Sequence, residues 1–317
     1  MKHCKTWLSL ILIGAVVNLL AFRPIPAQPV EEEDVRKEAE EARRALELFL
    51  REQRVLFRQG ELELELSTFY SMDTREELRS VDGSIAVPAE ITNRSVLPTL
   101  IVRYGLVNNL ELDVEIPFFG YAEEETDFRV EGIQTMEGII QIERIRTIDD
   151  QGLGDIVGRL RYQLWREQGG RPDVILDLNG KSRTGDDPLL GTGHWNVGGG
   201  ITLVKTLDPV VFFGRLGYTY TLEQKGRDPG DEISYSIGMG FSLNDRVSFN
   251  MQAIGAYVGR TERDGEKIPG SSLEIFSLQF GVTVLVTRYL FVEPVVNFGL
   301  TDDAVDVVVG VNVPFQF

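Results

Sequence analysis

The chain has 317 residues, of which 43% are hydrophobic, and it carries a formal net charge of −17 at pH 7. This length suffices for one large domain, and the negative charge argues against nucleic acid as a partner, because phosphate binding requires a positively charged surface. With a single cysteine, Cys4, and two histidines, His3 and His194, the chain can form neither an internal disulfide nor a His/Cys metal cluster. No nucleotide-binding or calcium-binding motif is found, so we expect no cofactor and no metal.

Residues 1–27 have the features of a secretory signal peptide. Lys2 and Lys5 give a basic start, residues 7–22 form an apolar run, and the segment RPIPA at 23–27 ends it. We expect cleavage after Ala27. The alternative is an uncleaved anchor helix, but the run falls short of the roughly 20 apolar residues that span a bilayer. No later segment could form a transmembrane helix, so residence in a membrane would require a β-barrel.

Residues 28–59 differ in composition from the rest of the chain. From residue 31 to 59 the segment is charged and free of Gly and Pro, and its apolar positions recur in steps of four and three. This spacing predicts a periplasmic amphipathic helix with a coiled-coil-like seam, which ends at Gly60. Three alternatives stay open: self-association through residues 31–59, packing on or inside a barrel, or a lone helix folded against its own domain.

From residue 60 to 317 the hydrophobic period is two, which predicts β-strands throughout. Leu62, Leu64 and Leu66, for example, alternate with Glu63 and Glu65. The segment 151–222 makes four such passes; in the first, Leu160 and Tyr162 share one face, and Arg159 and Arg161 the other. A soluble sandwich and a transmembrane barrel both produce this alternation, so the pattern of a single strand does not distinguish them.

The connections between the predicted strands favour the barrel. Short turns fall at 108–109, 168–171, 208–209, 244–245 and 287–288, and longer polar loops at 74–93, 122–150, 185–192, 224–230, 261–270 and 301–303. Outer-membrane barrels alternate short periplasmic turns with longer outer loops in this way. We therefore predict an all-β, antiparallel up-and-down barrel of about twelve strands over residues 60–317, embedded in outer-membrane lipid, with residues 122–150 projecting beyond the membrane as a hairpin.

The end of the chain agrees with a barrel in lipid. From Val305 to Phe317, alternate residues form a continuous Val and Phe face, which would promote aggregation in water. The terminal Phe315 and Phe317 are typical of the recognition signal that the barrel assembly machinery binds. Aromatic residues near the strand ends fit the girdles at the membrane interfaces: Trp195, Tyr218, Tyr220, Tyr257 and Tyr289.

Three motifs resemble a known family. They are GLGD at 152–155, K-x-x-TGD at 181–186 and GTG-x-W-x-VG at 191–198. The chain is similar, over roughly 60–317, to the outer-membrane family named for the meta-pathway of phenol degradation. The resemblance implies a Gram-negative, porin-like outer-membrane transporter, and it suggests small hydrophobic or aromatic compounds as solutes.

The polar face of the predicted strands supplies the candidate site, a charged lumen. Acidic and basic ladders that face each other across a lumen create a transverse field, which filters polar solutes. The alternative is that these charges only neutralise each other inside a plugged, structural or adhesion-type barrel. The candidate lumen residues are Glu111, Asp113, Glu115, Arg159, Arg161, Asp177, Lys181, Arg183 and Arg215.

Two further alternatives concern the loops and catalysis. The acidic runs in the loops indicate solvated loops or, less simply, a rim that attracts cations to a pore mouth. An outer-membrane hydrolase would have to use His194, beside which the spacing places no serine. We therefore expect a protein that is not an enzyme.

Overall fold

In the computed structural model, the described residues are 56–81, 85–128, 132–135, 138–141, 145–185, 190–224, 226–244, 246–287 and 289–317. Within these ranges the regular elements are β-strands, and no helix long and apolar enough to span a bilayer is found. The predicted signal peptide and residues 28–55 of the predicted helix lie outside the described residues. Residues 56–59, its expected last turn, are not helical. The prediction of a helix is therefore wrong for residues 56–59, because this segment is already hydrogen-bonded to the barrel.

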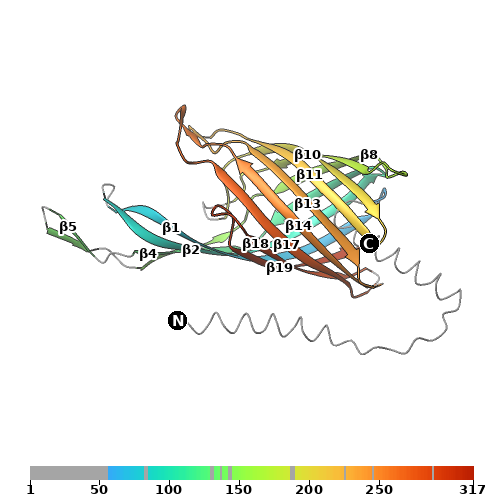
Figure 1. Cartoon of the computed structure of the whole chain (residues 1–317), viewed down its shortest axis with the longest axis horizontal. Coiled ribbons are helices and arrows are strands. Elements are labelled where there is room, and N and C mark those ends of the chain that lie inside the picture. Colours follow the sequence, from blue (N-terminus) through green and yellow to red (C-terminus); the bar gives the residue numbers. More distant parts are fainter. Residues whose placement is uncertain are drawn as a thin grey trace. The chain divides into compact units, whose positions relative to one another are not determined.

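Fourteen strands form one sheet, and β4 and β7 branch from it at β2. The other twelve close into an antiparallel barrel in the order β1-β2-β3-β8-β9-β10-β11-β13-β14-β17-β18-β19, with β19 returning to β1 (Figure 1). The predicted all-β barrel of twelve strands is confirmed. The barrel strands are β1 (Leu62–Val81), β2 (Ile85–Val107), β3 (Leu110–Pro117), β8 (Val157–Trp165), β9 (Asp173–Lys181), β10 (Asn196–Leu207), β11 (Val210–Thr221), β13 (Glu232–Ser242), β14 (Val247–Val258), β17 (Leu273–Leu285), β18 (Phe291–Gly299) and β19 (Val307–Gln316).

The period of two in the sequence places one set of side chains outside the barrel and the other inside. The outward set is apolar and exposed: Leu160 is 36% exposed, Leu216 56% and Ile237 68%. An exposed apolar surface that runs around a closed barrel is typical of a face that meets lipid. The aromatic residues predicted for the interfacial girdles are also exposed on this surface: Trp195, Tyr218, Tyr220, Tyr257 and Tyr289.

One end of the barrel carries the short connections. Val107 and Leu110 are joined by Asn108-Asn109, Leu207 and Val210 by Asp208-Pro209, and the β8–β9, β13–β14 and β17–β18 connections lie at the same end. These turns are where the sequence predicted them. We call this the short-turn mouth and the opposite end the long-loop mouth. The long loops carry a small sheet of β12 (Arg227–Asp228), β15 (Glu262–Arg263) and β16 (Glu266–Lys267).

The predicted loop at 74–93 is wrong, because β1 and β2 stay paired as far as Val81 and Ile85. β3 ends at Pro117, and the freed edge of β2 pairs instead with β4 (Gly120–Phe128), which pairs with β7 (Ile145–Gly152). Cross-strand ion pairs stabilise this extension, with Arg94 Nη1 at 3.2 Å from Glu123 and 3.1 Å from Glu125.

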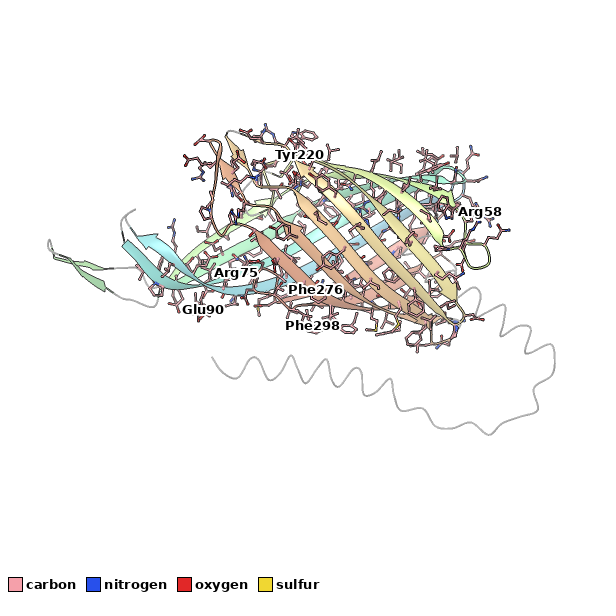
Figure 2. All side chains as sticks on the ribbon, turned by 45° about the horizontal axis from the view of Figure 1, so that its top comes forward. Arg58, Arg75, Glu90, Tyr220, Phe276 and Phe298 are labelled. Carbon is pink, nitrogen blue, oxygen red and sulfur yellow. The ribbon has the colours of Figure 1, made fainter. Side chains whose placement is uncertain are left out.

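The projection predicted from residues 122–150 is therefore a four-stranded extension of β1, β2, β4 and β7. The hairpin itself is short, formed by β5 (Gly132–Thr135) and β6 (Gly138–Gln141). Figure 2 shows Arg75 and Glu90 on the extension and Arg58 at the short-turn mouth, the other end of the barrel. The charged side chains at 74–93 therefore belong to paired strands and not to the predicted loop.

Candidate functional site

One wall of the lumen is a ladder of ion pairs between β3 and β8. The register places Glu111 opposite Arg161 and Asp113 opposite Arg159, as the sequence predicted for neighbouring antiparallel strands. Arg159 Nη1 lies 3.3 Å from Asp113 Oδ2 and 3.2 Å from Glu115 Oε1, and Arg161 Nη2 pairs with both Glu111 and Asp113. Glu111 and Asp113 are 1% and 2% exposed, so the arginines screen both carboxylates from the lumen.

The ladder continues on β1 and β2 through residues that sequence reasoning missed. Arg103 Nη1 lies 2.5 Å from Glu63 Oε1 and 2.8 Å from Glu65 Oε2, and Arg103 Nε lies 3.9 Å from Asp113 Oδ2. Both glutamates are buried, at 1% and 3% exposure. The signal was present in the sequence, since Glu63 and Glu65 alternate with leucines on one strand. Their basic partner, Arg103, could be predicted only from the strand register, by counting residues back from the turn at 108–109.

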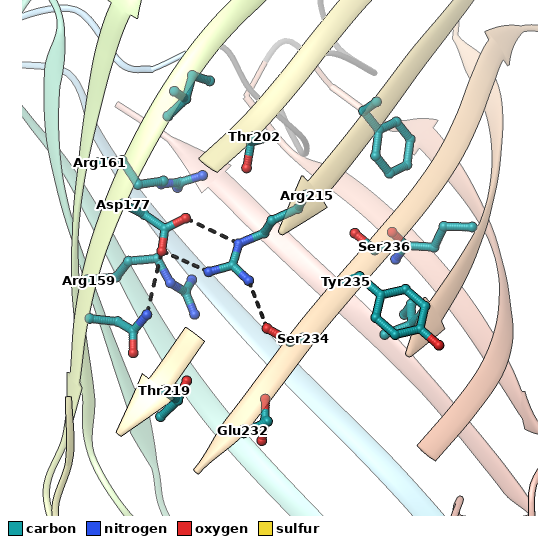
Figure 3. Close-up of a pocket in the computed structure, with 15 residues that line it drawn as sticks. Arg159, Arg161, Asp177, Thr202, Arg215, Thr219, Glu232, Ser234, Tyr235 and Ser236 are labelled. Carbon is teal, nitrogen blue, oxygen red and sulfur yellow. Dashed lines mark hydrogen bonds and ion pairs between the residues drawn. The ribbon is translucent and has the colours of Figure 1, made fainter. Parts of the chain in front are cut away.

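A second ion pair, between Arg215 and Asp177, spans the strand β10 that lies between their own strands. Arg215 on β11 donates to Asp177 on β9 through two bonds, Nε to Oδ1 at 3.1 Å and Nη2 to Oδ2 at 2.8 Å, and its Nη1 reaches Ser234 at 3.3 Å (Figure 3). The guanidinium passes over Gly200 on the intervening strand β10, where a Cβ would lie 2.7 Å from Arg215 Nη2. Gly200 thus makes room for this pair on the lumen face.

Between these ion pairs and the opposite wall lies a pocket of about 460 Å³. Arg159, Asp177 and Arg215 line its charged side, and Figure 3 shows Ser234 and Ser236 on the other. The facing strands β13, β14 and β17 contribute neutral polar side chains to the lumen, including a hydrogen bond of 2.9 Å from Gln252 to Gln279. The lumen therefore has one wall rich in ion pairs and a facing wall of mostly neutral polar side chains, to which β13 adds Glu232, and this arrangement can orient a polar solute.

Lys181 and Arg183 lie near the long-loop mouth, away from the ladder. β9 ends at Lys181, whose Nζ lies 3.5 Å from Asp155 Oδ2. Arg183 lies beyond the end of β9 and is exposed. The expectation that Arg183 belongs to the strand's lumen face is therefore wrong, because the chain has already turned into the loop.

Asp155 explains the family motifs in physical terms. Its carboxylate accepts hydrogen bonds from Gly185 N–H and Thr192 N–H, both at 2.9 Å, and from Thr192 Oγ1 at 2.8 Å. These bonds clamp the two ends of the loop at 185–192. Burial tends to raise the pKa of Asp155, but the hydrogen bonds from Thr192 and Gly185 outweigh it and lower the pKa.

At the short-turn mouth, the segment before β1 folds against the lumen wall. Leu56 and Phe57 are 5% and 6% exposed, and Phe57 N–H donates to Glu111 Oε2 at 2.9 Å. A Cβ on Gly105, which faces the lumen beside Glu111, would lie 2.0 Å from the Arg58 carbonyl oxygen. Residues 56–58 therefore narrow this mouth from inside, which corresponds to one of the packing alternatives for the N-terminal segment.

Within the ranges that the structure describes, no serine or carboxylate forms a hydrogen bond with His194. It is 9% exposed, and its Nδ1 lies 3.3 Å from the Leu222 carbonyl oxygen. Among the described residues, no group of three or more His, Cys, Asp or Glu side chains is placed to hold a metal ion.

The chain is similar in fold to a solved outer-membrane channel. The COG4313 outer membrane channel from Pseudomonas putida F1 aligns with a TM-score of 0.61 at 12% identity, over 84% of this chain and 98% of that one. The CymD monoaromatic hydrocarbon channel aligns at 0.40 and 11% identity, over 82% and 89%, and the translocator domain of the autotransporter NalP from Neisseria meningitidis at 0.45 and 12%, over 92% and 100%. The family described as "Putative MetA-pathway of phenol degradation" matches residues 80–317, and the chain belongs to this family.

Proposed function

We propose that this protein is an outer-membrane channel that passes small solutes through its charged lumen. The observation that carries the proposal is the contrast between the two faces of one closed barrel. The outward face is exposed and apolar, whereas the inward face carries buried ion pairs around a pocket of about 460 Å³. Membership of the family and the likeness in fold to the Pseudomonas putida channel support the same function.

The solutes in this proposal are small and have an apolar part. Ile175, Phe213 and Ile254 line the lumen pocket together with the arginines, so the pocket offers contacts to apolar as well as polar groups. The family's name supports compounds of the phenol type. Of the residues predicted from the sequence, Arg159, Arg161 and Arg215 are the proposed selectivity residues, because they line the lumen pocket. Glu111 and Asp113 are buried behind the arginines and act through them.

A non-conducting barrel is the second candidate, and two observations favour it. The charges of the ladder bind each other directly, and residues 56–58 narrow the short-turn mouth. The two candidates differ in whether an open path remains beside residues 56–58. An enzymatic function has no comparable support.

The proposal places the chain in a Gram-negative cell as follows. A signal peptide at 1–27 is cleaved after export, residues 28–55 form a periplasmic helix capable of self-association, and residues 60–317 form the barrel. The barrel assembly machinery binds the strand that ends in Phe315 and Phe317. Support comes from the sequence pattern and, for the last strand, from the exposed Phe315 and Phe317 at the end of β19.

Planar-bilayer recording of the refolded protein tests the proposal. Residues 28–317 should give discrete channels, and a variant that begins at residue 60 should conduct more, because residues 56–58 no longer narrow the mouth. Heat-modifiable gel mobility serves as the folding control for both proteins. Absence of channels from both folded proteins would reject the channel and favour the non-conducting barrel.

A further inference from the structure

Three arginines gather at the long-loop mouth of this strongly acidic protein. Arg183 follows β9, Arg227 lies on β12 and Arg263 lies on β15, and together they line a pocket of about 680 Å³. The register of the small sheet places Arg227 directly opposite Arg263. Like charges directly opposite each other across two strands are destabilising, so this arrangement costs folding free energy unless an anion lies between them.

None of the three guanidinium groups forms a hydrogen bond or an ion pair with another side chain in the described part of the chain. Asp264 also lines the pocket, at the hairpin turn after β15. Glu266 lies opposite Arg263 on β16, but no ion pair joins them in the described structure. Because all three arginines are exposed, an incoming anion would meet donors that are not already occupied.

This pocket adjoins a second one that leads inward. The second pocket, of about 790 Å³, shares Gly185, Gly193, His194 and Arg227 with the first. Apolar side chains line part of it: Leu190, Pro229 and Val258. It shares Glu232 with the lumen pocket, so adjoining cavities run from the arginines at the mouth to the ion pairs inside the barrel.

We propose that Arg183, Arg227 and Arg263 form an entry site for small organic acids. The arginines bind the carboxylate, and the apolar side chains of the adjoining pocket contact the body of the molecule. The proposal rests on the channel function and specifies its solute class. A net charge of −17 repels anions from most of the surface, so an anionic solute needs a local basic site to reach the lumen.

Calorimetric titration of the refolded full-length protein with benzoate tests the site, with benzamide as the neutral molecule of the same shape. We expect Arg227→Gln with Arg263→Gln to weaken benzoate binding at least about tenfold, because charge-assisted bonds to a carboxylate are lost. Binding of benzamide should not change. The double variant should fold, because β12 and β15 lie outside the barrel sheet. The matched control is Arg166→Gln with Arg171→Gln, at two exposed positions near the short-turn mouth. This control should leave benzoate binding unaltered.

Equal benzoate affinity in the wild type and the Arg227/Arg263 variant, or no binding to the wild type, would overturn the entry site. Tighter binding of inorganic phosphate than of benzoate would overturn the organic-acid assignment in favour of phosphate groups such as those of lipopolysaccharide. Benzoate flux into vesicles separates this proposal from the channel itself. A barrel that binds benzoate at the arginines without conducting refutes only the channel, whereas benzoate flux that is insensitive to the double variant refutes only the entry site.

Discussion

Arg103 holds together the most deeply buried charges of the lumen wall, and Arg103→Met should therefore destabilise the barrel strongly. The side chains of Glu63 and Glu65 are 2% and 4% exposed and lie within 2.5 and 2.8 Å of the guanidinium. Removal of one partner from a buried ion pair costs about 3–5 kcal/mol, since the carboxylates lose the charge of the guanidinium while they stay buried. Methionine keeps most of the side-chain length, so the lost charge dominates the effect.

Urea unfolding in lipid vesicles, followed by tryptophan fluorescence, measures this loss as a change in the free energy of unfolding. Arg171→Met, at an exposed position, should change it by less than about 0.5 kcal/mol. Adding Glu63→Gln and Glu65→Gln to Arg103→Met should recover much of the stability, because the two side chains that lose the Arg103 charge are then neutral. A loss below about 1 kcal/mol for Arg103→Met, or no recovery in the triple variant, would refute this account of the cluster.

Three further predictions concern facing, assembly and pH. Leu160→Arg should cost about 2–4 kcal/mol in vesicle unfolding if Leu160 lies near the bilayer midplane, and more than Thr202→Arg, which places the same charge in the lumen pocket, and equal losses would contradict the assigned faces. Deletion of Phe317 should lower the amount of barrel in the membrane more than it lowers the stability of the folded barrel, and normal membrane levels would count against its role in assembly. Burial tends to raise the pKa of Glu167, but hydrogen bonds from Lys205 and the Thr206 N–H lower it. Because the folded-state pKa is depressed, the stabilisation is present above the unfolded-state pKa and is lost as the pH falls through the folded-state pKa. Glu167→Gln should thus cost up to about 1 kcal/mol at pH 7 and nothing in acid, and a cost independent of pH would contradict this.

The sequence predicted the barrel because its physical cause is local. The alternation along each strand and the contrast between short turns and long loops can be read directly from the amino-acid sequence. The pairing of Glu111 with Arg161 follows from the predicted order of the strands. The turn at Asn108-Asn109 is where it was predicted to be for the same reason.

Features that depend on non-local geometry were missed or misplaced. The partner of Arg215 is two strands away, and the two side chains meet because Gly200 leaves the space between them free. The spacing of Arg183 continues that of Lys181 and so predicts a strand position, whereas β9 ends at Lys181 and the loop held by Asp155 at Gly185 begins directly after Arg183. Residues 74–93 carry many charges, a composition that favours a loop, although β1 and β2 stay paired through the segment and the ion pair of Arg94 with Glu123 lies directly beyond it.

The central claim is that solutes pass through the lumen pocket beside the ion pairs. Ser236 lines that pocket, and its neighbour Ile237 points outward and is 68% exposed. Ser236→Trp should reduce the unitary conductance in planar bilayers by about half or more, because the indole fills much of the pocket, while Ile237→Trp should conduct like the wild type. Unchanged conductance in a correctly folded Ser236→Trp variant would contradict the claim and show that the conducting path lies elsewhere.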